Sequence, residues 1–129
     1  MKKLLTLLFS IIILPISVYA SDVYYCSDDG LVGFDPADNF KIGTYNERKF
    51  KIMIDFENEN VVSESLYLGS TWDQKCWYTD IHDTLYCMNE VGLAFSINKN
   101  TLSYFNSKIY NSTEFTDTAF IGHGTCEKF

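Results

Sequence analysis

Large apolar residues recur at every second position in several short stretches of the chain, which is typical of strands that bury one face in a core. The clearest stretch is FKIMIDF at 50–56, and the polar run ENEN at 57–60 that follows it predicts a turn. We expect a return strand over 61–68. A second alternating stretch, LAFSIN at 93–98, precedes the turn-forming pair Lys99-Asn100 and predicts another hairpin.

The expected register of this second hairpin pairs residues whose numbers sum to 199, so that Ile97 faces Leu102 and Phe95 faces Tyr104. Short strands at such regular spacing predict an all-β fold, namely a single antiparallel β-barrel or sandwich of about eight short strands with two disulfides and little helix. The one helical turn that we expect lies at 44–47, where Thr and Glu stand three residues apart in a capping-box pattern.

Two of the four cysteines lie symmetrically about a polar turn. Cys76 and Cys87 are equally distant from the middle of DIHD at 80–83, so folding the segment there places them opposite each other. Cross-strand neighbours have Cβ atoms about 4.5–5.5 Å apart, and a disulfide needs about 3.5–4.5 Å. We therefore expect a Cys76–Cys87 disulfide that sets the register of one hairpin.

Cys26 and Cys126 remain, and a bond between them would join the first strand to the last. Four cysteines allow three connectivities, and the other two abandon the hairpin symmetry. A zinc site formed by all four cysteines is the competing interpretation. Zinc ribbons use closely spaced cysteine pairs, whereas the spacings here are 50, 11 and 39 residues. We expect no metal and no cofactor.

The first 20 residues have the pattern of a secretory signal peptide. Lys2 and Lys3 precede an apolar run over 4–18, and Val18-Tyr19-Ala20 ends in a small residue before a cleavage point at Ser21. We expect residues 1–20 to be removed and residues 21–129 to form one domain in the periplasm or outside the cell, where disulfides persist. No second apolar stretch of about 18 residues follows, so no membrane span is expected in the mature chain.

Removal of this segment takes away two lysines and no acids, and it changes the formal net charge from −7 to 8 − 17 = −9. An excess of acids repels phosphate backbones. The densest basic cluster, Arg48-Lys49-Lys51, lies between Glu47 and Asp55. We therefore expect no nucleic-acid binding, and we expect a monomer whose partner is a protein or a glycan.

His123 is the main candidate for a catalytic group, because glycines on both sides of it would let a ligand approach the imidazole closely. The competing interpretation is that the glycines mark a bulge or bend in a closing strand and that His123 only packs. A two-histidine hydrolase that also uses His82, at the hairpin tip, is a weaker expectation. No G-x-S-x-G nucleophile motif is present, and the acidic clusters at 28–30 and 35–39 read as solvated turns.

Two tryptophans indicate a binding surface. Trp72 lies in a polar loop, and Trp77 follows Cys76, so its side chain points to the opposite face of the strand from the disulfide. Trp and Tyr combine a large apolar area with a polar tip. We expect a patch near Trp72 and Trp77 to bind a partner, with His123 as a further candidate.

The chain resembles small exported bacterial proteins of uncharacterised function in its signal peptide, its YYC start at 24–26, its strand at 50–56 and its GTCEKF end. Its size and all-β pattern are also similar to those of the periplasmic C-type lysozyme inhibitors, which are small antiparallel barrels. Neither resemblance carries a functional residue onto this sequence.

Three functions follow from these observations. The first is a non-catalytic exported binding or interaction module of the cell envelope, which presents aromatic side chains to a protein or glycan. The second is a carrier that holds a small apolar ligand inside a lipocalin-like barrel. The third is a small hydrolase built around His123.

Overall fold

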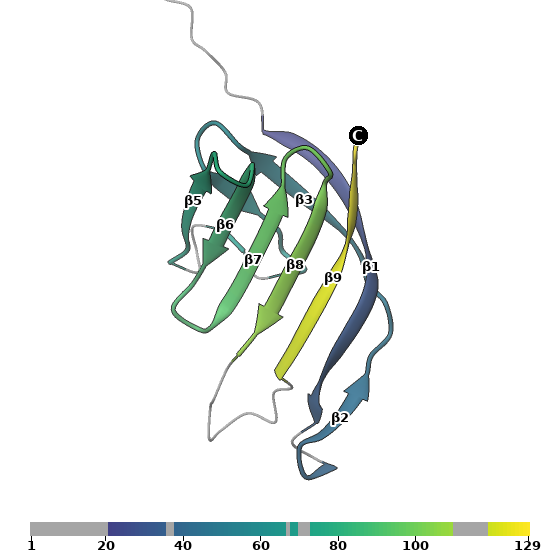
Figure 1. Ribbon diagram of the computed structural model, residues 1–129. Coiled ribbons are helices and arrows are strands. Elements are labelled where there is room, and N and C mark those ends of the chain that lie inside the picture. Colours follow the sequence, from purple (N-terminus) through teal and green to yellow (C-terminus); the bar gives the residue numbers. More distant parts are fainter. Residues whose placement is uncertain (1–20, 36–37, 67, 70–72, 110–118) are drawn as a thin grey trace, which may run out of the picture.

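The computed structural model describes residues 21–35, 38–66, 68–69, 73–109 and 119–129, and within these ranges the chain forms one antiparallel sheet without an α-helix (Figure 1). No helix in these ranges is long and apolar enough to cross a lipid bilayer. The nine strands are β1 (Asp22–Asp35), β2 (Lys41–Thr44), β3 (Lys49–Asp55), β4 (Asn60–Val62), β5 (Lys75–Thr79), β6 (Thr84–Met88), β7 (Leu93–Asn98), β8 (Ser103–Lys108) and β9 (Ala119–Lys128).

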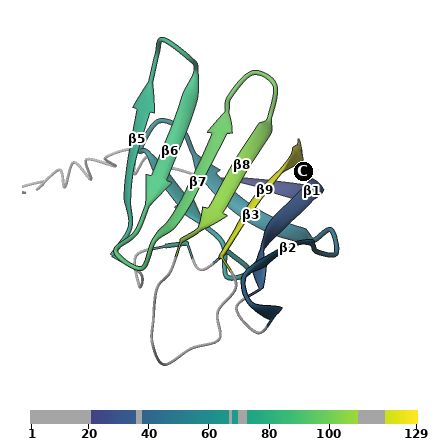
Figure 2. The same cartoon turned by 60° about the horizontal axis from the view of Figure 1, so that its bottom comes forward.

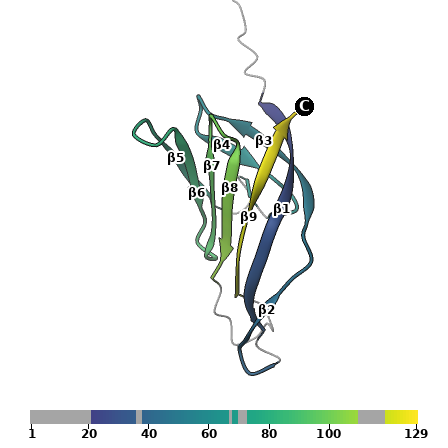
Figure 3. The ribbon, with the colours of Figure 1, turned by 45° about the vertical axis from the view of Figure 1, so that its right-hand side comes forward.

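The strands follow the order β4-β3-β1-β9-β8-β7-β6-β5 across the sheet, and β2 pairs with the second half of β1. The sheet curls into a nearly closed eight-strand barrel, in which β3 and β4 lie across the interior from β6, β7 and β8 (Figure 2, Figure 3). The expected all-β fold with two disulfides and little helix is confirmed, in its barrel form.

Side chains bridge the seam of the barrel between β4 and β5, where no backbone ladder joins the described residues. Gln74 Nε2 donates a hydrogen bond to Val61 O at 2.9 Å, and the backbone N–H of Tyr78 donates to Glu59 Oε1 at 2.9 Å. These bonds satisfy polar groups that an edge strand would otherwise expose.

Both predicted disulfides are present. Cys76 and Cys87 are direct register partners in β5 and β6, and Cys26 and Cys126 are direct register partners in β1 and β9. The second bond joins residues 100 positions apart and ties the first strand to the last. The hairpin symmetry of the sequence therefore assigned the connectivity correctly.

A β-bulge in β1 corrects the expectation of a solvated turn at 28–30. These residues lie inside one continuous strand, and the ladder with β9 shifts between Asp28 and Gly30, leaving Asp29 as the extra residue. The bulge reverses the alternation, so that even-numbered residues face the core before it and odd-numbered residues face inward after it. Asp28 is consequently buried in the barrel and is not solvated.

The helical turn expected at 44–47 is absent. The backbone N–H of Tyr45 donates to Leu31 O, and the backbone N–H of Arg48 donates to Asp28 Oδ2. The segment therefore stays extended along β1 as the chain passes from β2 to β3. Hydrogen bonds to β1 outweigh the local capping-box preference.

The β7–β8 hairpin is present, but its predicted register is wrong by two residues, because Ile97 faces Tyr104 and not Leu102. The turn is longer than expected. Asn98 Oδ1 accepts hydrogen bonds from the backbone N–H groups of residues 100 and 101, and Leu102 adopts a positive φ of 55°. A shift of two residues keeps every side chain on its face of the sheet. The residues of β7 that were predicted to face the core therefore do so.

The return strand expected over 61–68 ends early. β4 stops at Val62, and Ser63 and Leu68 then exchange two backbone hydrogen bonds across a tight turn. This turn places Leu66 and Leu68 against the end of the barrel, where both are buried.

Inward-facing side chains from both sides of the barrel fill most of its interior. The ring of Phe50 on β3 meets the ring of Tyr104 on β8 with centroids 5.5 Å apart, which shows that the two walls touch. The buried cluster consists of Tyr24, Cys26, Phe50, Ile52, Ile54, Val61, Leu66, Leu68, Leu85, Cys87, Phe95, Ile97, Tyr104 and Cys126.

Candidate functional site

Five side chains from β5 to β9 form one row across the outside of the barrel. In the ladders Trp77 pairs with Tyr86, Tyr86 with Ser96, Ser96 with Phe105, and Phe105 with His123. Direct partners in antiparallel strands share a face. The sheet thus places Trp77 and His123, which the sequence proposed separately, in a single row, whereas Trp72 lies outside the described residues.

A second row runs beside the first and contains Met88, Ala94, Ser107, Ile121 and Val32. We call the ten residues of the two rows the outer aromatic face. The side chains of Phe105 and Ile121 on this face are 60% and 58% exposed. Single apolar residues are common on protein surfaces, but neighbouring ones on successive strands form a contiguous patch of the kind that marks an interaction site.

A shallow groove of about 250 Å³ follows the middle of the outer aromatic face, above the small side chains of β7. Trp77, Tyr86 and Met88 form one wall, and Phe105 and Ile121 form the other. The rings of Trp77 and Tyr86 stack with centroids 5.8 Å apart and an interplanar angle of 15°. This stacking restricts both rings, so the first wall is preorganised for contact.

Charge is missing from the outer aromatic face. Its ten residues include no Asp, Glu, Lys or Arg, although the chain has 17 acidic and 10 basic residues. Lys75 pairs with Met88 at the edge of the face, and the outward positions of β3 carry Lys49 and Lys51. Depletion of charge together with Trp, Tyr, Phe and Met is the composition of the buried centre of protein interfaces.

His123 contributes to this surface by packing. Its ring lies 6.0 Å from the ring of Phe105 between centroids, and a Cβ on Gly30 would lie 3.0 Å from its Nε2. Among the described residues it makes no hydrogen bond to a carboxylate or hydroxyl group. His82 lies exposed in the β5–β6 turn and belongs to neither row. The described residues therefore do not assemble an acid–base pair around His123.

The glycines beside His123 face the interior and make room for polar side chains there. A Cβ on Gly124 would lie 2.0 Å from Ser27 O and 2.7 Å from Tyr104 Oη, and a Cβ on Gly122 would lie 2.6 Å from Asn106 Oδ1. Any larger residue at these two positions would displace the neighbouring backbone or the buried polar groups.

Those polar groups form a buried network around Asp28. Its carboxylate accepts hydrogen bonds from Arg48 Nε at 2.7 Å and from Tyr104 Oη at 2.6 Å. Burial by itself would raise the pKa of Asp28, but the hydrogen bonds from Arg48 and Tyr104 outweigh it and the pKa is lowered. Burial and the Asp28 hydrogen bond raise the pKa of Tyr104 far above its ordinary value, so its hydroxyl stays a donor.

The sequence analysis did not predict this network, although the sequence contains one indication of it. The glycines at 122 and 124 alternate with larger residues on the closing strand, which indicates that something bulky lies against that strand's inner face. The identity of the bulky groups depends on β1 and β8, which are remote in sequence.

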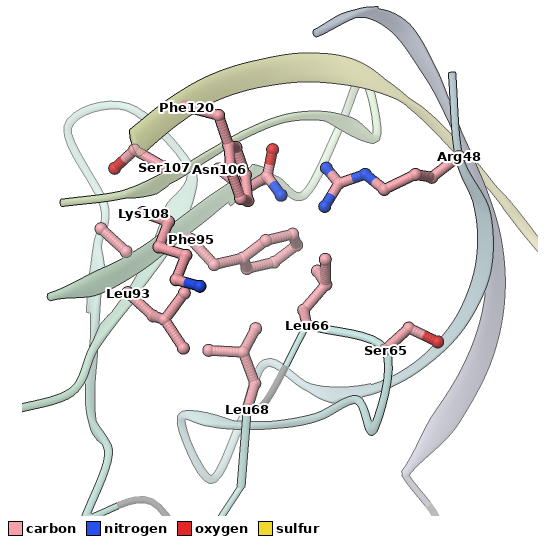
Figure 4. A pocket seen from close by; sticks show the side chains of 11 residues that line it. Arg48, Ser65, Leu66, Leu68, Leu93, Phe95, Asn106, Ser107, Lys108 and Phe120 are labelled. Atoms are coloured by element: carbon pink, nitrogen blue, oxygen red, sulfur yellow. The ribbon is translucent and has the colours of Figure 1, made fainter. Parts of the chain in front are cut away.

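One small cavity lies at the end of the barrel, with a volume of about 90 Å³ (Figure 4). Its apolar wall includes Phe95, Leu66 and Leu93, and Arg48 and Lys108 reach it from opposite sides. Ligand pockets for drug-sized molecules have volumes of about 300–1,000 Å³, so this cavity suits only a very small molecule.

No protein-family model matches the chain, and no curated protein or solved structure shows significant similarity to it. The function must therefore be inferred from the geometry of the chain itself.

Proposed function

We propose that the chain is a non-catalytic exported binding module whose outer aromatic face docks onto a protein partner. The observation that carries this proposal is that the outer aromatic face is uncharged and contiguous across β5 to β9, with exposed aromatic and aliphatic side chains on both sides of the small residues of β7. A soluble domain gains nothing from exposing such a face, whereas a partner that covers it removes the apolar area from water.

The composition of the face favours a protein over a glycan. Stacked rings such as Trp77 and Tyr86 suit sugars as well as proteins, but sugar hydroxyls also need several polar partners beside the rings. The face has only Ser96, Ser107 and His123 as polar side chains beside the rings. Met88, Ile121 and Val32 offer only apolar contact. Aromatic side chains and Met with no charged neighbour on the face have the composition of the buried centre of a protein interface.

An extracytoplasmic location supports the proposal. The two disulfides are typical of an oxidising compartment outside the cytoplasm. The signal-peptide pattern of residues 1–20 adds the expectation of export, to the periplasm or to the outside of the cell. The partner would then be a component of the envelope or of the surroundings.

The alternative function, a carrier for a small apolar ligand, receives less support. Facing side chains meet across the described interior, and the cavity of about 90 Å³ is smaller than the pockets that enclose such ligands. A hydrolase built around His123 has no general acid or base partner among the described side chains.

Site-specific photo-crosslinking in an exporting cell tests the proposed surface. A photoreactive residue at position 105 should give one discrete adduct with a protein, and the same residue at position 51, on the outer side of β3, should give none. Adducts at both positions, or at neither, would contradict the proposal. An adduct of twice the chain mass would identify a second copy as the occupant.

Binding of a purified probe provides the quantitative test. The resemblance to periplasmic C-type lysozyme inhibitors makes a c-type lysozyme the first probe, followed by any protein that the crosslinks identify. Phe105→Ser should weaken binding about tenfold or more, because central aromatic residues dominate interface energies. Met53→Ser, which replaces an exposed apolar residue on β3, is the matched control and should leave the affinity unchanged.

A further inference from the structure

The cavity at the end of the barrel combines apolar walls with two basic side chains. Leu66, Leu93 and Phe95 line it, and Figure 4 shows the terminal nitrogens of Arg48 and the ammonium group of Lys108 pointing into it from opposite sides. The cavity thus lies where the buried polar network around Asp28 meets the apolar cluster of the core.

Arg48 is held in one orientation. Its Nε and Nη2 donate to the two oxygens of Asp28 at 2.7 and 3.2 Å, and its guanidinium lies over the ring of Phe120 at 5.0 Å. In the amide orientation that satisfies both of its neighbours, Asn106 accepts a further bond from Nη2 at 2.8 Å. A guanidinium fixed in this way loses little further freedom when it binds a ligand.

One edge of the same guanidinium still lacks an acceptor. Within the part of the chain that the structure describes, no side chain or carbonyl accepts a hydrogen bond from Nη1 of Arg48. The side chain of Arg48 is 30% exposed, so Nη1 is accessible to water or to a ligand in the cavity. Because the terminal nitrogens point into the cavity, an acceptor there would complete the set.

We propose that this cavity binds a small organic carboxylate, which receives hydrogen bonds from Arg48 and places its short carbon chain against Phe95, Leu66 and Leu93. Only Nη1 of the guanidinium remains to donate, and hydrogen bonds from a charged donor to a carboxylate are stronger than neutral ones. The volume of about 90 Å³ corresponds to about three water molecules. An acid of about five non-hydrogen atoms therefore fits, and a fatty acid does not.

The expected affinity is modest, because Asp28 already compensates much of the charge of Arg48. A ligand of this size also has few atoms with which to form contacts. We expect a dissociation constant in the millimolar range, which lies within the affinity that very small ligands reach.

Titration of the full-length mature protein with sodium propionate, followed by NMR at constant ionic strength, tests this site. Saturable shifts should appear at Phe95, Leu66 and Leu93, and propionamide, the neutral analogue, should cause none of them. Arg48→Lys keeps the charge but removes the planar guanidinium that holds Nη1 in place, and it should weaken propionate binding about tenfold. Non-saturable shifts, or equal shifts with propionamide, would overturn the site.

A second variant decides the question if Arg48→Lys does not fold. Ser65 is exposed at the mouth of the cavity, so Ser65→Phe should obstruct the site without disturbing the core. Glu64→Phe, at the neighbouring exposed position in the same turn, is the control and should bind propionate normally. Unchanged binding in Ser65→Phe, or equal loss in both variants, would contradict the proposal. The propionate titrations test the cavity alone and do not depend on whether the outer aromatic face binds a partner.

Discussion

At the scale of single residues, Asp28 connects three parts of the barrel. It lies at the bulge of β1, accepts hydrogen bonds from Arg48 at the entry to β3, and accepts another from Tyr104 on β8. A buried carboxylate is tolerated only when such partners replace water. Removing one member of the network leaves the others desolvated and unpaired, which is why buried ion pairs are costly to break.

We predict that Asp28→Asn lowers the free energy of unfolding at neutral pH by about 2–4 kcal/mol, because an amide cannot accept from both Arg48 nitrogens and leaves the guanidinium uncompensated. Urea denaturation measures this difference. Asp29→Asn, in the same bulge but exposed, should change the value by no more than about 0.5 kcal/mol. Equal effects of the two substitutions would show that the network does not stabilise the fold.

The Asp28→Asn and Asp29→Asn variants also test how the free energy of unfolding depends on pH. The pKa of Asp28 is lower in the folded protein than in the unfolded chain. The ionised Asp28 carboxylate therefore stabilises the fold fully when the pH is above the pKa of the unfolded chain, about 3.9. This stabilisation is lost as the pH falls through the lower pKa of the folded protein. The unfolding free energy of Asp28→Asn should decline less steeply with acid than that of the wild type, whereas Asp29→Asn should follow the wild type.

At the scale of strands, β9 is shaped by the network inside it. Its buried positions are Gly122 and Gly124, where polar side chains need space, followed by Cys126, where the disulfide crosses to β1. On its outer side the same strand presents Ile121 and His123 to solvent. One short sequence thus serves the interior and the outer aromatic face at the same time.

We predict that Gly124→Ala destabilises the protein by about 1–3 kcal/mol, because the added Cβ would lie 2.0 Å from the backbone oxygen of Ser27 and force the β1–β9 ladder apart. Thermal or urea unfolding measures the loss. Gly43→Ala on β2 is the matched control, since a Cβ there has no heavy atom within 4 Å, and it should be nearly neutral. If Gly124→Ala leaves the free energy of unfolding unchanged, β9 and β1 are packed less tightly than the 2.0 Å approach to Ser27 O indicates.

The two hairpins and the bulge in β1 show which structural features a local sequence pattern predicts and which it does not. The β5–β6 hairpin was predicted to the residue, because Cys76 and Cys87 flank a short turn symmetrically. The β7–β8 register was missed by two residues, because the longer turn depends on the Asn98 side chain and on a positive φ at Leu102. The bulge in β1 was not predicted because Asp28-Asp29-Gly30 has the composition of a solvated turn, and only pairing with β9 makes these residues part of a strand.

At the scale of the whole molecule, the barrel is held at two places. The Cys26–Cys126 bond joins the first and last strands, and the side chains of Gln74 and Glu59 bridge the seam on the other side. A domain of this size has a limited core, so covalent links contribute a large share of its stability.

We predict that the two disulfides contribute unequally. Replacing Cys26 and Cys126 together by alanine should cost about 4.7 kcal/mol, and replacing Cys76 and Cys87 should cost a little under about 3 kcal/mol, because the longer loop restricts the unfolded chain more. Unfolding of both double variants under non-reducing conditions measures the difference. A larger loss for the hairpin pair would show that loop length does not govern the effect here.

The sequence by itself determined the features that depend on neighbours along the chain: which stretches alternate, which residues of β3 and β7 face inward, and the Cys76–Cys87 register, which left Cys26 to pair with Cys126. Only the tertiary structure decided that Asp28 is buried, that β9 needs glycine on its inner face, and that Trp77, Phe105 and His123 form one row. These features depend on the register between strands that are remote in sequence. That register is set by the closure of the barrel as a whole, because each strand must satisfy two neighbours at once.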